Sequence, residues 1–213
     1  GEMTRVSDGT VPRDARYPFR WAPTGDRLYF HRDCGGDEQN DIVAIGRDGA
    51  VEPVVENDGQ TILADVSENG RYLLLVSDVG QQLNLYEHDR ETGATTRLTE
   101  YRQPVRGGVY TPDANRVAYT TNESESLDNR DVYAAAVARD DGDPATLTDV
   151  RQPQIGREAA EPAVRDVSPH GTPLPVSDNT SATPRVGLSH LTDETPAWLT
   201  DPAHPEPPAT FLH

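Results

Sequence analysis

The sequence predicts an all-β protein, a partial β-propeller of about four four-stranded blades in an open arc. One recurring signature is a turn of Pro, Gly, Asp or Asn followed by an alternating or apolar β-rich run. Its copies occupy residues 22–30, 67–77, 111–121 and 168–177. A second signature, an apolar residue and a Thr-like residue before an acid, occupies 1–8, 49–56, 93–100, 143–149 and 195–201. A repeat near 45 residues with four strands per unit is typical of propeller blades.

The turn positions set the period of the repeat. Gly25, Gly70, Ala114 and Gly171 are equivalent, and lie 45, 44 and 57 residues apart. A third strand is expected between the two signatures of each unit, at 41–49, 83–93, 131–142 and 185–194. Each blade therefore has a short first strand, a buried second strand, a third strand and an edge strand. No apolar pattern with a period of 3.6 runs for ten residues, which argues against helical repeats.

These strands divide the chain into blades and links. The expected blades are 17–60, 61–104, 105–150 and 164–205, and 151–163 is a linker. Residues 1–16 are expected to be the last strand of a preceding blade plus a link, and 206–213 the start of a truncated next blade. Neither end resembles the polar cap that a terminal repeat needs. We therefore expect a fragment of a longer protein or a truncated gene product, with self-association through its open ends.

The fourth blade is expected to be irregular. Its second strand carries Pro173 and Pro175, and proline is excluded from central strands because it lacks the amide hydrogen that the ladder needs. The longer linker before this blade explains the 57-residue step.

The composition limits the possible partners and compartment. Asp and Glu number 36 against 19 basic residues, all of which are Arg, and the net charge is −17. This surface would repel nucleic acid and anionic membranes. Scattered acidity without lysine is typical of proteins that work in molar salt. Cys34 is the single cysteine, and no apolar run is long enough for a membrane span, so the simplest setting is a reducing cytoplasm.

Three segments resemble a known family of propellers. TNESESLDNRDVY (121–133) is similar to a box of TolB-like and WD40-like repeats, and YFHRDCGGDEQNDI (29–42) to a segment of prolyl oligopeptidase propellers. VSDNTSATPRVGL (176–188) fits the same blade pattern. The chain thus resembles the N-terminal propeller of S9 serine peptidases, without their hydrolase domain. That resemblance implies a propeller that gates the active site and docks peptides, with the catalytic Ser, Asp and His elsewhere.

No catalytic, cofactor-binding or metal-binding residues are predicted in this chain. A nucleophile elbow needs Gly-x-Ser-x-Gly, which does not occur. The six histidines lack metal-ligand spacing, and the loops 56–60 and 139–144 are too short for calcium. The best candidates for substrate contact are acids that follow the second strand of the first blade. These are Asp33, Asp37, Glu38 and Asp41, which would hold a peptide amino terminus or else form a solvated turn.

Three hypotheses for the function remain open. The first is the gating and docking part of an S9 serine peptidase, inactive alone, whose partners are the parent hydrolase domain and a peptide substrate. The second is a stand-alone TolB-like propeller that binds proteins or peptides. The third is a decayed reading frame without a folded product.

Overall fold

The fold is known from a computed structural model. It describes residues 4–11, 17, 19–33, 39–123, 131–140, 143–152, 163–164, 173–178, 185–190 and 197–199. These residues contain sixteen strands in four four-stranded antiparallel sheets, and no helix. Within every sheet the strands follow one another in chain order, so each sheet is a meander of hairpins. The predicted all-β architecture of successive four-stranded blades is confirmed.

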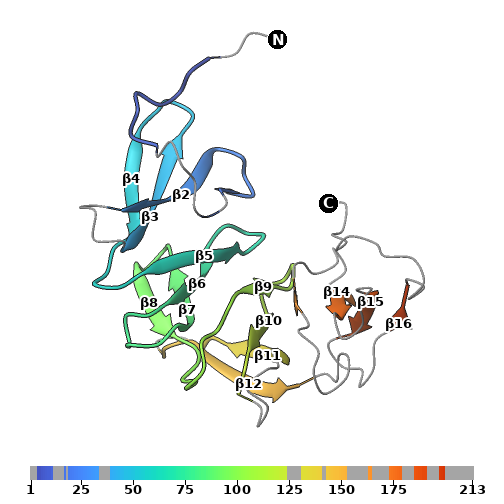
Figure 1. The fold of residues 1–213 in the computed structure, drawn as a ribbon. Helices are drawn as coiled ribbons and strands as arrows, with labels where there is room; N and C mark the ends of the chain where they lie inside the picture. The colour runs from blue at the N-terminus through green and yellow to red at the C-terminus, as the bar shows by residue number, and fades with distance from the viewer. Residues whose placement is uncertain are drawn as a thin grey trace.

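Each sheet is one blade, and the four blades follow one another in an arc (Figure 1). Blade 1 contains β1 (Arg20–Trp21), β2 (Arg27–Asp33), β3 (Asn40–Gly46) and β4 (Val51–Val55). Blade 2 contains β5 (Thr61–Val66), β6 (Tyr72–Ser77), β7 (Asn84–Asp89) and β8 (Ala94–Arg97). Blade 3 contains β9 (Gly108–Tyr110), β10 (Arg116–Thr121), β11 (Asp131–Ala138) and β12 (Thr146–Arg151). Blade 4 contains β13 (Ala163–Val164), β14 (Pro173–Asp178), β15 (Arg185–His190) and β16 (Ala197–Trp198).

The turn between the first and second strands is the same in blades 1 to 3. Gly25, Gly70 and Ala114 all have left-handed backbone, with φ of 64°, 71° and 55°. The amide of each donates to the carbonyl oxygen three residues earlier, at N–O distances of 2.8, 2.7 and 2.7 Å. The alignment of these positions from the sequence is thereby confirmed. Gly171, the fourth expected copy, lies outside the described residues.

The apolar core is divided between the interfaces of successive blades. Blades 1 and 2 enclose a cluster that includes Tyr29, Ile42, Leu63, Leu73 and Leu75. Blades 2 and 3 enclose another, which includes Leu74, Val76, Leu85, Val117 and Tyr119. Along β6, alternate side chains therefore enter the two interfaces, as the period of a strand requires. Thin cores of this kind suit a chain in which only 34% of the residues are hydrophobic.

An arginine closes the turn of each of these blades. Arg47, Arg90 and Arg139 each directly follow the third strand, and donate to the carbonyl oxygens of Gly25, Gly70 and Ala114 at 2.9, 2.8 and 2.8 Å. This recurring contact was not predicted from the sequence. Its signal is an arginine, an acid and a nearby glycine at the end of every third-strand run from 41 to 142.

Blade 4 tolerates its two prolines within a central strand. β14 pairs with β15 along its whole length, and with β13 only at Val176 and Ser177. Pro173 and Pro175 have the same parity, so their nitrogens face the same neighbour. β13 reaches neither proline, so neither one interrupts the ladder between β13 and β14. The side-chain packing of this blade lies largely outside the described residues, so its predicted irregularity stays a prediction.

The N-terminal segment lies over the outer face of blade 1. Residues 4–11 form no strand, and Val11 packs against the buried side chains of Phe30, Val43 and Ile45. Their assignment to a preceding blade remains a prediction, as does that of 206–213, which lies outside the described residues. Trp21, on the same sheet, is 63% exposed. No helix among the described residues is long and apolar enough to cross a membrane.

Candidate functional site

The candidate site is a cavity at the rim of the propeller, between blades 1 and 2. In each blade the second strand ends, the third begins and the fourth ends at this one edge. The cavity has a volume of about 240 Å³. The residues around it come from the end of β4, the link to β5, and β6, β7 and β8 with their turns. They are Val55, Glu56, Asn57, Leu75, Ser77, Val79, Tyr86 and Thr95.

The cavity has an apolar floor and a polar mouth. Leu75, Tyr86 and Val55 belong to the core cluster of blades 1 and 2, and are 0%, 6% and 5% exposed. Beside them the buried hydroxyl of Ser77 is the polar group of the floor. Glu56 and Thr95 are exposed at the mouth. A floor of this kind binds an apolar group, and the polar mouth orients what is attached to it.

Hydrogen bonds hold the link that forms one wall. The Asn57 side chain donates to the Thr61 hydroxyl at 2.7 Å and accepts from the Gly59 amide at 2.9 Å. The Thr61 hydroxyl also contacts that of Ser77 at 3.0 Å. A side chain at Gly59 would place its Cβ only 2.8 Å from the Val79 amide nitrogen, so only glycine allows this close approach. The cavity is therefore preorganised.

The electrostatic field at the mouth is negative. Glu56 lines it, and Asp58 and Asp78 are the neighbours of lining residues. Asp78 accepts a hydrogen bond from the Gln60 amide at 2.7 Å, so its carboxylate is fixed at this edge. Such a mouth favours neutral or cationic ligands and repels anions.

The acids singled out from the sequence lie on the same rim, in blade 1. Asp33 is exposed at the end of β2, and Asp41 is half-buried near the start of β3. Asp37 and Glu38 lie outside the described residues. Asp41 has the strand position that Asn84 has in blade 2, where the buried amide oxygen accepts from the Tyr101 amide at 2.8 Å. In blade 2, the residue at that position thus supports the link to blade 3. Contact of the acids with a peptide remains a prediction.

His31 lies inside β2 and joins blade 1 to blade 2. It is 8% exposed, and its Nε2 accepts a hydrogen bond from the Leu63 amide at 2.9 Å. Burial, with a smaller effect of the charge on Arg20, lowers its pKa to about 4. The neutral ring is thus a structural acceptor. Cys34 lies outside the described residues. In the described part of the chain no three His, Cys, Asp or Glu side chains gather as a metal site requires.

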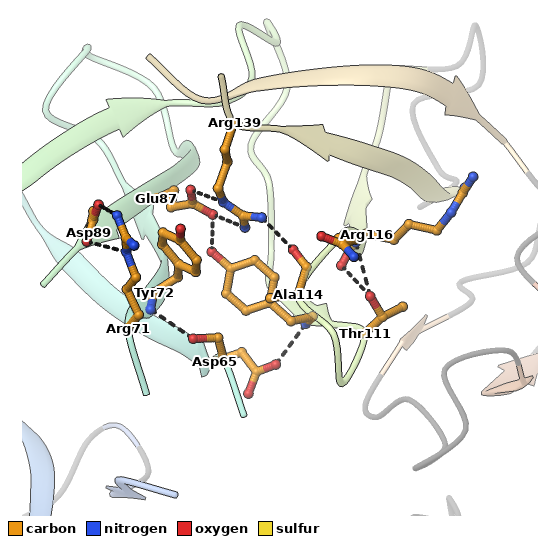
Figure 2. Close-up of polar contacts among 12 residues, drawn as sticks. Asp65, Arg71, Tyr72, Glu87, Asp89, Thr111, Ala114, Arg116 and Arg139 are labelled. Carbon is orange, nitrogen blue, oxygen red and sulfur yellow. Dashed lines mark hydrogen bonds and ion pairs between the residues drawn. The ribbon is translucent and has the colours of Figure 1, made fainter. Parts of the chain in front are cut away.

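A buried ionic network, which was not predicted from the sequence, joins blade 2 to blade 3. Glu87, 3% exposed on β7, accepts from Arg139 Nε and Nη2 at 2.7 and 2.6 Å, and from the Tyr110 hydroxyl at 2.6 Å. Figure 2 shows Arg139 extending from the end of β11 to Glu87, and to the carbonyl of Ala114. Its guanidinium also lies over the Tyr72 ring, 4.1 Å from the centroid. Burial, then the charge of Glu87, raises the pKa of Tyr110 well above its usual value.

Comparison with known proteins identifies the fold. No protein-family model matches this sequence, and no curated protein matches it. A putative TolB from Agrobacterium tumefaciens matches 84% of this chain over 62% of its own, with 16% identity and a TM-score of 0.65. A puromycin-hydrolyzing peptidase from Mycobacterium tuberculosis matches 82% of this chain over 27% of its own, with 16% identity and a TM-score of 0.60. A prolyl endopeptidase matches 85% over 28%, with 13% identity and a TM-score of 0.58.

The likeness to these structures establishes a β-propeller related in shape to those of TolB and of prolyl endopeptidases. At identities of 13% to 16% it establishes the fold and nothing finer. The chain spans less than two thirds of the length of each of them.

Proposed function

We propose that this chain is the docking and gating propeller of an S9-type serine peptidase, which captures peptides at its rim and requires a separate hydrolase domain for cleavage. The observation that supports this function best is the open, acid-edged cavity between blades 1 and 2. Its apolar floor suits one side chain of a peptide, and its carboxylates suit an amino terminus or a basic neighbour.

The alternative is a stand-alone TolB-like propeller that binds a protein or peptide. The alternative is favoured by the coverage of the similar structures. This chain matches 62% of the TolB from Agrobacterium tumefaciens but only 27% of the Mycobacterium tuberculosis peptidase. Both functions use the rim to bind a peptide. They differ in whether a hydrolase domain receives it.

Binding is tested first, with the intact chain in molar KCl. Fluorescein-labelled peptide libraries are titrated and followed by anisotropy, and peptide hydrolysis is followed in the same samples. We expect saturable binding without turnover. Turnover that copurifies with the chain would overturn the proposal, because it would require an active site within this propeller. A complete lack of binding would remove both functions.

The nucleotide sequence that flanks the coding region on both sides distinguishes the two functions. A Gly-x-Ser-x-Gly motif within a few hundred codons downstream of His213, in a continuing or broken frame, supports the peptidase. Its absence on both sides excludes the peptidase and leaves the stand-alone binder.

A further inference from the structure

We propose that the cavity between blades 1 and 2 recognises an aromatic side chain of the docked peptide, tyrosine above all. This inference rests on the proposed function, since it assumes that peptides dock at the rim. Its evidence is the next interface along the chain, where the protein fills the equivalent position with a tyrosine of its own.

The repeat register identifies the equivalent positions. Ser67 and Thr111 open equivalent turns, because each accepts the turn amide through its carbonyl oxygen. Counting ten residues back from each places Asn57 opposite Tyr101, and eight residues forward places Leu75 opposite Tyr119. Strand pairing then relates the third pair, since Leu75 pairs with Tyr86 and Tyr119 with Tyr133. Three of the residues that surround the cavity, Asn57, Leu75 and Tyr86, thus correspond to three tyrosines in the next interface.

Between blades 2 and 3 these tyrosines form a closed cluster. The rings of Tyr119 and Tyr133 are stacked, with centroids 5.6 Å apart and an interplanar angle of 11°. Tyr101 covers both, at centroid distances of 6.1 and 5.8 Å. Its hydroxyl bonds that of Tyr119 at 2.8 Å, and Tyr119 is fully buried. The link residue Tyr101 therefore supplies the ring that seals this interface at the rim.

Between blades 1 and 2, the position equivalent to Tyr101 carries no ring. Asn57 stands where Tyr101 would, and the smaller Leu75 stands where Tyr119 would. Only Tyr86 is retained from the three rings, and it lines the cavity of about 240 Å³ that results. An aromatic side chain that enters here packs on Tyr86 and Leu75 as Tyr101 packs on its two partners. Ser77 and Asn57 also line the cavity, and the Asn57 amide has a second hydrogen beyond the one that it donates to Thr61, which suits a phenol oxygen.

The negative charge at the mouth of the cavity limits which peptides can bind. Because Glu56 and Asp78 make this edge negative, a phosphorylated tyrosine is repelled. A tyrosine near the amino terminus, or beside a basic residue, is favoured. The volume lies below the roughly 300–1,000 Å³ of sites for drug-sized ligands, which fits one side chain better than a larger molecule.

The experiment compares peptides that differ at one position. Five labelled peptides carry Tyr, Phe, Leu, Ala or phosphotyrosine after an Arg-Gly leader, and are titrated against the intact chain in molar KCl. We expect the Tyr peptide to bind about tenfold more tightly than the Ala peptide, an increment within the range for burying one aromatic side chain. Phe should rank next, and the phosphotyrosine peptide should bind no more tightly than the Ala peptide, because a charged phosphate does not suit an apolar floor. Equal affinities for Tyr and Ala would overturn the inference.

Two variants and one control locate the binding. Asn57→Tyr restores the internal ring and should remove the preference for Tyr, whereas Glu68→Tyr adds the same side chain at an exposed turn in blade 2 and should leave it intact. Val79→Trp narrows the mouth from an exposed position without removing a side-chain hydrogen bond, and should have the effect of Asn57→Tyr even if that variant folds poorly. If the peptides bind but neither variant changes the preference, the inference is wrong while the proposed function stands. If no peptide binds, both fail.

Discussion

The buried pair of Glu87 and Arg139 should carry much of the stability of the interface between blades 2 and 3. Glu87→Gln keeps the shape of the side chain but removes the charge that accepts three hydrogen bonds of 2.6–2.7 Å. Arg139, with 18% of its side chain exposed, then keeps an uncompensated charge. Breaking a buried pair by removing one partner costs about 3–5 kcal/mol. We expect a loss of that size in the free energy of unfolding.

A matched control is Glu91, in the turn that follows β7. Glu91 makes an ion pair with Arg71 at 2.8 Å, but 66% of its side chain is exposed. Glu91→Gln should therefore cost no more than about 1 kcal/mol, and the cost should vanish in molar KCl because salt screens an exposed pair. The measurement is urea unfolding followed by tryptophan and tyrosine fluorescence, at several KCl concentrations. If Glu87→Gln costs less than 1 kcal/mol, or loses its cost with salt as Glu91→Gln does, the network is not a desolvated anchor.

Three further predictions concern other parts of the fold. Since the pKa of His31 is lowered to about 4 from 6.5, the free energy of unfolding should fall by up to about 3 kcal/mol as the pH drops from about 6.5 towards 4. His31→Gln keeps an acceptor for the Leu63 amide and should flatten this pH dependence in urea titrations at pH 7 and pH 5. Gly70→Ala should cost about 1 kcal/mol through its left-handed backbone alone, because the nearest atom to an added Cβ is 3.7 Å away. Ala114→Gly should change the stability by less than that, and equal costs of the two variants in thermal melts would contradict the shared turn geometry. With a net charge of −17, the chain should unfold in dilute buffer and refold in molar KCl by circular dichroism, and a stable monomer without salt would argue against adaptation to high salt.

The blade architecture was predictable because turns impose their residues on the sequence. A left-handed turn needs Gly or a tolerant residue at one position, and a buried strand needs a short apolar run, so Gly25, Gly70 and Ala114 could be aligned without a structure. The alternation of β6 between two interfaces follows from the period of a strand. These constraints are local, and a single sequence contains them in full.

The contacts between blades were not predictable in the same way. Glu87 sits in a strand of a chain with 36 acids, and nothing local distinguishes it from a solvated carboxylate. Its burial depends on Arg139 from the next blade, 52 residues later. His31, one of the six histidines without metal-ligand spacing, is an acceptor for an amide 32 residues away. Such pairs are fixed by the stacking of blades, which sequence periodicity does not specify.

The cavity could have been predicted from the sequence once the register of the repeats was known. Successive interfaces share one backbone geometry, so a substitution at an equivalent position changes the content of the interface and leaves its frame in place. Tyr101 fills one rim position, whereas Asn57 leaves the equivalent position open. Hydrogen bonds of the Asn57 side chain with Thr61 and Gly59 hold the wall of the cavity in place. A void in an otherwise close-packed interface loses dispersion contacts that a larger side chain would regain. Asn57→Tyr should therefore raise the melting temperature while it removes the preference for tyrosine peptides. A variant with a lower melting temperature and no such preference would show that the two rim positions are not equivalent.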